Sequence, residues 1–408
     1  RYFLHQALST PCLDLLESAQ GSWLTSVSGE QYLDFHGNSV HQLGHGHPKV
    51  VAAVQQQLAD LSFAPRRYTH QVAIDCARTL AELAPRDLNR VLFAPGGSEV
   101  VGIALKLARF ITGNSKVVSL WDAFHGASLD AISVGGEACF RAGMGPLMAG
   151  VERIPPPTRY RGVWYRGEGD DLHYADYLEY VIEKEGGIGA FIAEPIRNTD
   201  VQVPSKAYWQ RVREICDRHK VLLIVDEIPN ALGRTGHWFS FEEFGIEPDI
   251  IVMSKAVGGG LPLAVLGIKK QFDAWAPGHH TGTFRGNQLA MATCLTTLKI
   301  LKDQNIADKV AAQGEWLKGQ LKEMAKRYPV IGHVRGLGMM IGIEIVKPHE
   351  AADHMGCFPG DGELSALIQK KCFEAGLILE RGGRNGCVLR LLPSLLITNA
   401  ELEIFLDK

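Results

Sequence analysis

Two residues capable of covalent and proton chemistry each stand at the end of a predicted buried strand. Lys255 ends the apolar run DIIVMSK and precedes AVGGG, and Asp226 lies at the end of VLLIVDE. A lysine is usually a solvated charge, but burial lowers the pKa of an amine and makes it a Schiff-base nucleophile. A buried aspartate needs a partner, which the protonated ring nitrogen of pyridoxal phosphate would provide. The alternative for Asp226 is that it caps the segment that follows.

Two further segments fit the phosphate and the ring of such a cofactor. Gly96, Gly97 and Ser98 lie between a predicted strand and a predicted helix, where backbone N–H groups and a hydroxyl can bind phosphate. Phe124, followed by His125, could stack on a flat heterocycle. Each signal is weak alone, because glycine-rich turns are common and a single phenylalanine more often belongs to the core.

The hydrophobic pattern predicts the elements that position these residues. Short β-branched runs without alternation are typical of buried parallel strands, and helical periodicity separates them. The order of strands and helices predicts an α/β domain that binds ligands at the carboxyl ends of its strands. The predicted strands lie at residues 91–97, 116–121, 188–195, 221–227 and 249–255, and two of the helices lie at 100–112 and 206–219.

The two ends of the chain differ from this central pattern. Residues 22–35 alternate around a Ser-Gly turn and predict a hairpin. After about residue 290 a long helix and then the strand-like runs VRGLGMMIGIEIV and VLRLLPSLLIT predict a smaller α+β domain. Residues 155–187 are interpreted as a surface insertion with a short helix. The predicted domains are an N-terminal part of the small domain (1–50), a large cofactor-binding domain (51–290) and the C-terminal small domain (291–408).

Composition excludes several classes of protein. The 408 residues include 42 Lys plus Arg and 45 Asp plus Glu, a net charge of −3, which is too balanced for a general nucleic-acid binder. No apolar run approaches the ~18 residues of a membrane span. No signal peptide is visible at the start, which leaves open a leader removed earlier. The eight scattered cysteines contain no CxxC pair, and reduced thiols in a cytoplasmic protein are the expectation.

Longer motifs make the chain similar to the class III aminotransferases, which are pyridoxal-phosphate enzymes of fold type I. The resemblance runs from YLDF to LLPSLLIT, and its motifs are LGHGHPKVVAAV, DEIPNALGRTG, DIIVMSKAVGGGLPLA and HTGTFRGNQLA. It implies an α/β fold like that of aspartate aminotransferase, with a large domain built on a mostly parallel sheet and a smaller α+β domain. It also implies a homodimer, because the HTGTFRG segment of this family reaches the cofactor of the neighbouring subunit.

The resemblance also assigns roles to individual residues. Lys255 would bind the cofactor covalently and then act as the proton-transfer base, and Asp226 would pair with the pyridine nitrogen. Arg390, in VLRLLP, matches an arginine that clamps a substrate carboxylate, for which a planar guanidinium is suited. The other residues expected around the cofactor are Gly97, Ser98, Phe124, His125 and Glu194 from one subunit and Thr283 from the other.

Departures from the family pattern point to a particular substrate. Pro229 replaces a glutamine that usually supports the ring hydroxyl, and Thr199 replaces a glutamate that can pair with the C-terminal arginine. Without that glutamate, the usual switch between two substrates is not expected. Arginines are also added where a site could form, and together they favour a strong anion such as phosphonate or phosphate. They are Arg66 and Arg67 in a rim loop, Arg197, Arg285 and Arg390, although each could simply be a solvated surface charge.

The histidines of the N-terminal loop carry a weaker prediction. His41 is a candidate to bind substrate and to protonate a leaving hydroxide, since the ordinary pKa of histidine is near neutral. A metal site is not expected at His45 and His47, because the HGHP run belongs to the family pattern and no carboxylate stands at helical ligand spacing.

The combination of FHGNSVHQLGHGHP, FAPRRYTH and GGSEVVGIALKLAR resembles a branch of the family that acts in bacterial phosphonate breakdown. This branch consists of ammonia-lyases that act on a hydroxylated aminophosphonate. Two other hypotheses stay open. One is an ordinary aminotransferase that moves an amino group from an ω-amine or aminophosphonate to a keto acid. The other is a non-catalytic binding protein, against which Lys255 and Asp226 argue.

Overall fold

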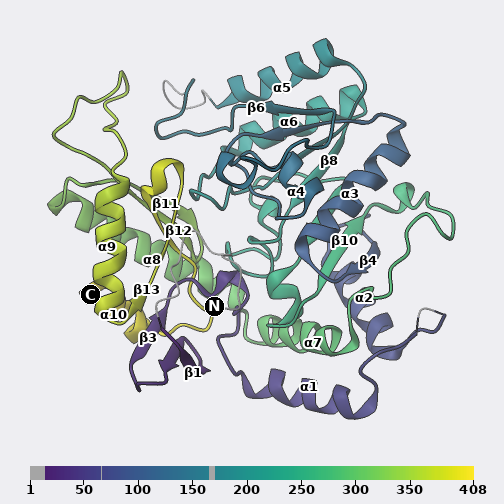
Figure 1. Cartoon of the computed structure of the whole chain (residues 1–408), viewed down its shortest axis with the longest axis horizontal. Coiled ribbons are helices and arrows are strands. Elements are labelled where there is room, and N and C mark those ends of the chain that lie inside the picture. Colours follow the sequence, from purple (N-terminus) through teal and green to yellow (C-terminus); the bar gives the residue numbers. More distant parts are fainter. Residues whose placement is uncertain (1–13, 66, 165–170) are drawn as a thin grey trace.

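The computed structural model describes residues 14–65, 67–164 and 171–408. Its largest sheet has seven strands in the order β4-β10-β9-β8-β7-β5-β6, of which β4, β10, β8 and β6 are labelled in Figure 1. The five strands from β9 to β6 are parallel. β10 is antiparallel to both β9 and β4, so the predicted strand at 91–97 belongs to the antiparallel edge. The strands are β4 (Arg90–Ala94), β5 (Lys116–Leu120), β6 (Val151–Ile154), β7 (Ile188–Ala193), β8 (Leu222–Asp226), β9 (Ile250–Met253) and β10 (Ala264–Ile268).

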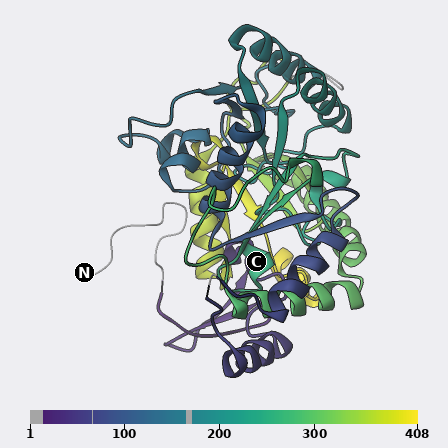
Figure 2. The same cartoon turned by 90° about the vertical axis from the view of Figure 1, so that its right-hand side faces the viewer.

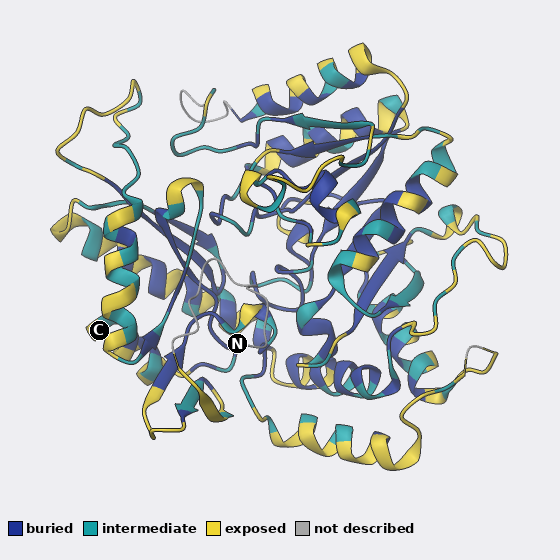
Figure 3. Ribbon diagram, viewed as in Figure 1, coloured by how far each residue is buried: buried dark blue, intermediate teal, exposed yellow. Residues whose placement is uncertain are grey.

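Helices cover both faces of this sheet, which explains why its strands are apolar throughout. Ile224 of β8 lies in a core shared with α3 (Gly97–Thr112), whereas Leu223 and Val225 lie in the core shared with α6 (Lys206–His219). All residues of β7, β8 and β9 are buried (Figure 3). A strand buried on both faces needs no polar alternation.

The segment interpreted as a surface insertion is in part structural. Its helix, α5 (Leu172–Glu185), is 14 residues long and packs against α6. Tyr174 and Leu178 are fully buried because their i, i+4 spacing presents one apolar face to α6. The expectation of a short helix on the surface was therefore wrong, and helical periodicity in LHYADYLEYVIEKE was the overlooked signal.

Two four-stranded sheets lie beside the large sheet, and one of them joins both ends of the chain (Figure 1). The hairpin predicted at 22–35 is formed by β2 and β3. β13 then pairs in parallel with β3, placing Leu377 opposite Leu33. The limits of the domains stay a prediction. The strands are β1 (Leu16–Gln20), β2 (Trp23–Ser26), β3 (Gln31–Asp34) and β13 (Leu377–Ile378), and in the other sheet β11 (Ile331–Leu337), β12 (Met340–Ile345), β14 (Glu380–Gly382) and β15 (Val388–Leu391).

The remaining helices surround these sheets. α1 packs on α7 and lies at the same end of the molecule as the β1–β3 hairpin (Figure 2). The strand predicted from VLRLLPSLLIT ends at Leu391, because Pro393 has no N–H for a ladder. In the part of the chain that the structure describes, no helix combines the length and apolar character of a membrane span. The helices are α1 (Pro48–Asp60), α2 (Gln71–Leu83), α4 (Leu129–Val134), α7 (Gln288–Asp303), α8 (Ile306–Arg327), α9 (Gly362–Glu374) and α10 (Asn399–Asp407).

Candidate active site

Lys255 and Asp226 meet at the carboxyl edge of the large sheet. Asp226 is the last residue of β8, and Lys255 follows β9 and begins the short 3-10 helix η4 (Lys255–Gly258). β8 and β9 are parallel neighbours with Asp226 opposite Val252, so both residues leave the sheet at the same edge. The backbone of Lys255 has φ 51°. This left-handed conformation is uncommon for a residue with a side chain and is typical of functional positions.

Asp226 is fixed by its neighbours. The side chain is 1% exposed, and its Oδ2 lies 2.7 Å from Nδ1 of His125. Its Oδ1 accepts a hydrogen bond of 2.9 Å from the backbone N–H of Ile228. Burial opposes the charged imidazole, yet the hydrogen bond and charge of Asp226 raise the pKa of His125 above its ordinary value. The sequence predicted both residues near a cofactor but not their contact.

The environment of Lys255 favours the neutral amine. Burial lowers the pKa of Lys255 below its ordinary value, and the nearby Arg390 guanidinium lowers it further, while the carboxylates of Asp226 and Glu194 act in the opposite direction. A neutral amine is the nucleophilic form. The position and environment of Lys255 therefore suit a covalent bond to an aldehyde.

A cradle for a phosphate lies at the start of α3. Gly97 begins the helix, and the first N–H groups of a helix have no partner within it. The Ser98 Oγ accepts a hydrogen bond of 2.9 Å from the N–H of Ala127, which leaves its own proton for a ligand. Gly126 has φ +132°, and a Cβ there would lie 2.4 Å from Ser98 Oγ. Only glycine therefore allows the loop after β5 to approach this helix end.

Glu194 links the loop after β7 to the loop that carries Phe124. Its Oε1 accepts from the N–H of Asn198 at 3.0 Å, and its Oε2 accepts from the N–H of Phe124 at 3.4 Å. Burial raises the pKa of Glu194 to about 7. The Phe124 ring is half-buried and lies 4.7 Å from that of Phe140. Glu194 thus positions the backbone from which Phe124 projects.

These residues together fit pyridoxal phosphate. The cradle supplies N–H and O–H donors for a dianion, Asp226 is a buried carboxylate suited to a protonated ring nitrogen, and Lys255 stands on the adjacent strand end. A buried carboxylate is costly unless it is paired, and a protonated ring nitrogen would be a second partner of Asp226 beside His125. The Nε2 of His125 is also buried, and it has no hydrogen-bond partner among the described residues. This nitrogen can therefore still form a hydrogen bond with a ligand or water.

Arg390, predicted to clamp a substrate anion, already has partners within the chain. Its Nη2 lies 2.9 Å from Oε1 of Glu380, and its Nη1 donates to the carbonyl oxygen of Asn198 at 2.9 Å. Its Nε is buried without a partner among the described residues. Glu380 also contacts His36 through its other oxygen. The sequence analysis did not predict a role for Glu380. Its contact with His36 depends on the pairing of β13 with β3, which joins distant parts of the chain.

His41 lies apart from this group. Its side chain is 5% exposed, and its Nε2 is 3.7 Å from Oδ2 of Asp34. Burial lowers the pKa of His41 to about 4, with further lowering by the Arg234 and His45 charges. An imidazole with this pKa is neutral at pH 7, so its environment does not suit the acid role predicted for it.

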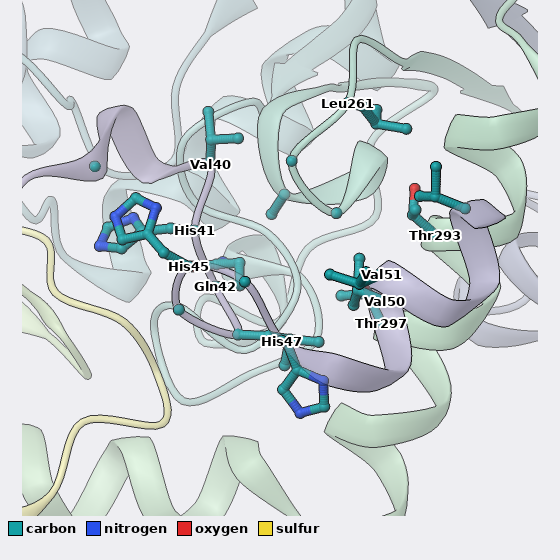
Figure 4. A pocket seen from close by; sticks show the side chains of 18 of the residues that line it. Val40, His41, Gln42, His45, His47, Val50, Val51, Leu261, Thr293 and Thr297 are labelled. Atoms are coloured by element: carbon teal, nitrogen blue, oxygen red, sulfur yellow. The ribbon is translucent and has the colours of Figure 1, made fainter. Parts of the chain in front are cut away.

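The same histidine belongs to a cluster with the spacing of a metal site. Ligand atoms of Asp34, His41 and His45 lie within 4.8 Å of one another. The charge of the fully buried Arg234 acts on His41 and opposes a divalent cation there, so we assign no metal. His41 and His45 lie at one side of a cavity of about 400 Å³ between the 37–47 loop, α1 and α7 (Figure 4). Lys255 and Asp226 do not line this cavity.

The remaining predicted residues lie on the rim or in the interior. Arg67 and Thr283 are exposed, and Arg66 lies outside the described residues. Phe63 and Phe284, which flank these positions, contact each other with ring centroids 5.6 Å apart. Arg197, a candidate anion binder, is buried and pairs with Asp200, to which its Nε donates at 2.7 Å. It therefore has a structural partner.

Comparison with known proteins agrees with this architecture. The model of the aminotransferase class-III family matches residues 6–408. The chain is 52% identical to the (R)-1-hydroxy-2-aminoethylphosphonate ammonia-lyase of Vibrio splendidus, over 99% of this chain and 86% of that protein. It is 42% identical to the diaminobutyrate–2-oxoglutarate aminotransferase of Haemophilus influenzae, over 96% and 88%.

Among solved structures, an amine transaminase from an uncultivated Pseudomonas species, in its PLP-bound form, superimposes with a TM-score of 0.92 at 29% identity, covering 100% of this chain and 97% of that one. The predicted fold type I architecture and the predicted pyridoxal-phosphate cofactor are confirmed. The chain belongs to the aminotransferase class-III family.

Proposed function

We propose that this protein is a pyridoxal-phosphate-dependent ammonia-lyase. Its substrate would be (R)-1-hydroxy-2-aminoethylphosphonate, and its products ammonia and phosphonoacetaldehyde. The relation to the Vibrio splendidus ammonia-lyase, 52% identity over 99% of the chain, carries this proposal. The reaction would take place in the cytoplasm, as expected from cysteines without a disulfide pattern.

The residues at the sheet edge have distinct roles in this proposal. Lys255 holds the cofactor, Asp226 keeps its ring nitrogen protonated with the support of His125, and Phe124 covers a face of the ring. Gly97 and Ser98 bind its phosphate, and Thr283 of a second subunit completes the phosphate site in a homodimer. When bound, pyridoxal phosphate withdraws the electron pair of the carbon that loses a proton.

Proton transfer and substrate binding follow from the same arrangement. The Lys255 amine, favoured in its neutral form, takes a proton from the carbon that bears the substrate nitrogen. Arg390 and the exposed Arg67 supply positive charge for a phosphonate, together with Arg66, which the sequence predicts as a further anion binder. Loss of hydroxide from the adjacent carbon gives an enamine, which water converts to ammonia and the aldehyde.

An aminotransferase is the second candidate, because the Haemophilus influenzae relative at 42% identity has that activity. The lyase and aminotransferase reactions begin with the same proton abstraction and differ afterwards. A transaminase needs a keto acid to accept the amino group and complete a cycle, whereas the lyase needs no acceptor.

The deciding experiment is to incubate the purified protein with 1-hydroxy-2-aminoethylphosphonate in the absence of any keto acid. Ammonia release and cofactor absorbance are followed together. The lyase predicts many turnovers and a cofactor spectrum that returns to its initial state. A single turnover that leaves pyridoxamine phosphate and resumes only with a keto acid would identify a transaminase. Protein without cofactor absorbance would support the non-catalytic alternative.

A further inference from the structure

His36 precedes a short helix that packs against the one that begins with Lys255, and the charge of Lys255 acts on its imidazole. It immediately precedes the 3-10 helix η1 (Gly37–Ser39), and η1 packs against η4, which begins with Lys255. The His36 side chain is buried. Its backbone N–H donates to Asp34 Oδ1 at 2.9 Å, which fixes the turn after β3. A titratable ring is thereby held near the reacting edge of the sheet.

Glu380 joins His36 to Arg390. One oxygen of its carboxylate contacts Nε2 of His36, and the other lies 2.9 Å from Nη2 of Arg390. Glu380 and Arg390 stand opposite each other on β14 and β15. Imidazole, carboxylate and guanidinium thus form a chain of contacts that ends at the predicted anion-binding arginine.

The proposed elimination is accelerated by an acid near the leaving group. Hydroxide is a poor leaving group, and a positioned proton donor accelerates its departure by about 10²–10⁴-fold. Burial, together with the Arg390 and Lys255 charges, lowers the pKa of His36, while Glu380 and Asp34 act against this shift. A phosphonate dianion bound beside Arg390 adds negative charge and favours the imidazolium. Substrate binding would therefore act against the lowering of the His36 pKa and favour its charged form.

Resting on the lyase function proposed above, we propose that His36, held through its Nε2 by Glu380, donates its Nδ1 proton to the hydroxyl group that leaves the substrate. Lys255 removes a proton from the nitrogen-bearing carbon. The electron pair of that C–H bond becomes a carbon–carbon π bond as the C–O bond of the adjacent carbon breaks. The oxygen takes the His36 proton and departs as water. His36 then recovers a proton from solvent, and Lys255 releases to solvent the proton that it took from carbon, so that the cycle balances.

The overall step requires no oxidant or co-reactant. The hydroxyl group leaves as one molecule of water, and one molecule of water is consumed when the enamine hydrolyses to ammonia and aldehyde. Glu380 does not touch the reacting atoms in this scheme. It is a positioning residue that orients the imidazole and favours its charged form.

The test compares wild type with His36→Gln, both loaded with cofactor, on three compounds. 1-Hydroxy-2-aminoethylphosphonate needs an acid to lose hydroxide. 1-Chloro-2-aminoethylphosphonate loses chloride, which needs no proton. 2-Aminoethylphosphonate has no leaving group, and exchange of its C2 hydrogen with D2O, followed by NMR, reports proton abstraction by Lys255 alone.

We expect His36→Gln to lose about 100-fold or more in turnover of the hydroxy compound. Chloride release and hydrogen exchange should stay within about 3-fold of wild type. Equal losses on all three compounds would overturn the proposal and assign His36 a binding or structural role. An unchanged turnover of the hydroxy compound would overturn it as well. If wild type itself releases no ammonia, the lyase function fails and the His36 role fails with it.

Two further variants separate positioning from folding. Glu380→Gln keeps a hydrogen-bond acceptor and loses the charge that raises the pKa of His36. We therefore expect a smaller loss on the hydroxy compound and a pH–rate profile whose alkaline limb, where His36 loses its proton, moves to lower pH. A profile identical to that of wild type would contradict the role of Glu380. His47→Gln, in the same loop, is the matched control and should behave as wild type on all three compounds.

Discussion

The carboxyl edge of the large sheet and the exposed rim that carries Arg67 and Thr283 are organised differently. At the edge, Asp226, Glu194 and Ser98 are each held by hydrogen bonds within one chain. On the rim, Arg67 and Thr283 are exposed. The groups suited to chemistry are therefore preorganised within a single chain. Arg67 and Thr283, which are predicted to complete substrate and phosphate binding, are exposed instead, where they can reach the site of a second subunit.

The largest effect should follow from removing the amine at the edge. Lys255→Ala leaves neither a covalent anchor nor a base, so we expect turnover to fall by at least about 10³-fold. Mass spectrometry after borohydride reduction should show no covalently attached cofactor. Added methylamine should restore part of the rate, because it replaces the missing base. A variant that retains more than a tenth of the rate would show that another group is the base.

A buried carboxyl next to Asp226 should make stability depend on pH. Glu227 is fully buried, and burial raises its pKa from 4.5 to about 7. A carboxyl whose pKa is higher in the folded than in the unfolded state holds its proton more tightly when folded. Stability therefore falls as pH rises from about 4.5 to about 7, by up to about 3 kcal/mol. Urea denaturation of Glu227→Gln should show a decrease smaller by this amount, while the buried Glu194, whose pKa is also raised to about 7, keeps its own contribution. An identical slope in both proteins would refute the role of Glu227.

The phosphate site offers a direct comparison of the two regions. Ser98→Ala removes a donor at the edge and Thr283→Val removes one on the rim, and each should weaken cofactor binding about 10-fold. A mixed dimer of wild type with the double variant Lys255→Ala/Thr283→Val has one competent lysine. If Thr283 acts across subunits, that site should bind cofactor as weakly as Thr283→Val alone. Affinity equal to wild type would show that Thr283 acts within its own chain.

The smallest effect is expected for the rim arginine. Arg67 is exposed, and water screens an exposed charge, so Arg67→Ala should raise the KM for the aminophosphonate only about 2- to 5-fold without changing kcat. Raising the salt concentration should reduce the difference between the two proteins. A change in kcat would place Arg67 closer to the chemistry than its exposure indicates.

The sequence predicted the edge better than the contacts that span the molecule. Asp226 and Lys255 were found because a polar residue that ends an apolar strand is a local signal. The pairs His125–Asp226 and Glu380–Arg390 join residues far apart in the chain, and no local pattern encodes them. The pKa of about 4 for His41 also depends on burial by segments far away in the chain. The residue type alone therefore suggested an acid that the surroundings of His41 do not support.

The pairing of β3 with β13 has a consequence for how this protein is made. β3, which contains Leu33, cannot pair with β13 until Leu377 has been synthesised. At ribosomal rates of about 5–20 residues per second, this delay is roughly 20–70 s. The large sheet can form meanwhile, because its strands lie between residues 90 and 268. The turn that carries His36 follows β3 directly and meets Glu380 only at the end of translation, so the nascent enzyme would gain its phosphate cradle well before its His36–Glu380 contact.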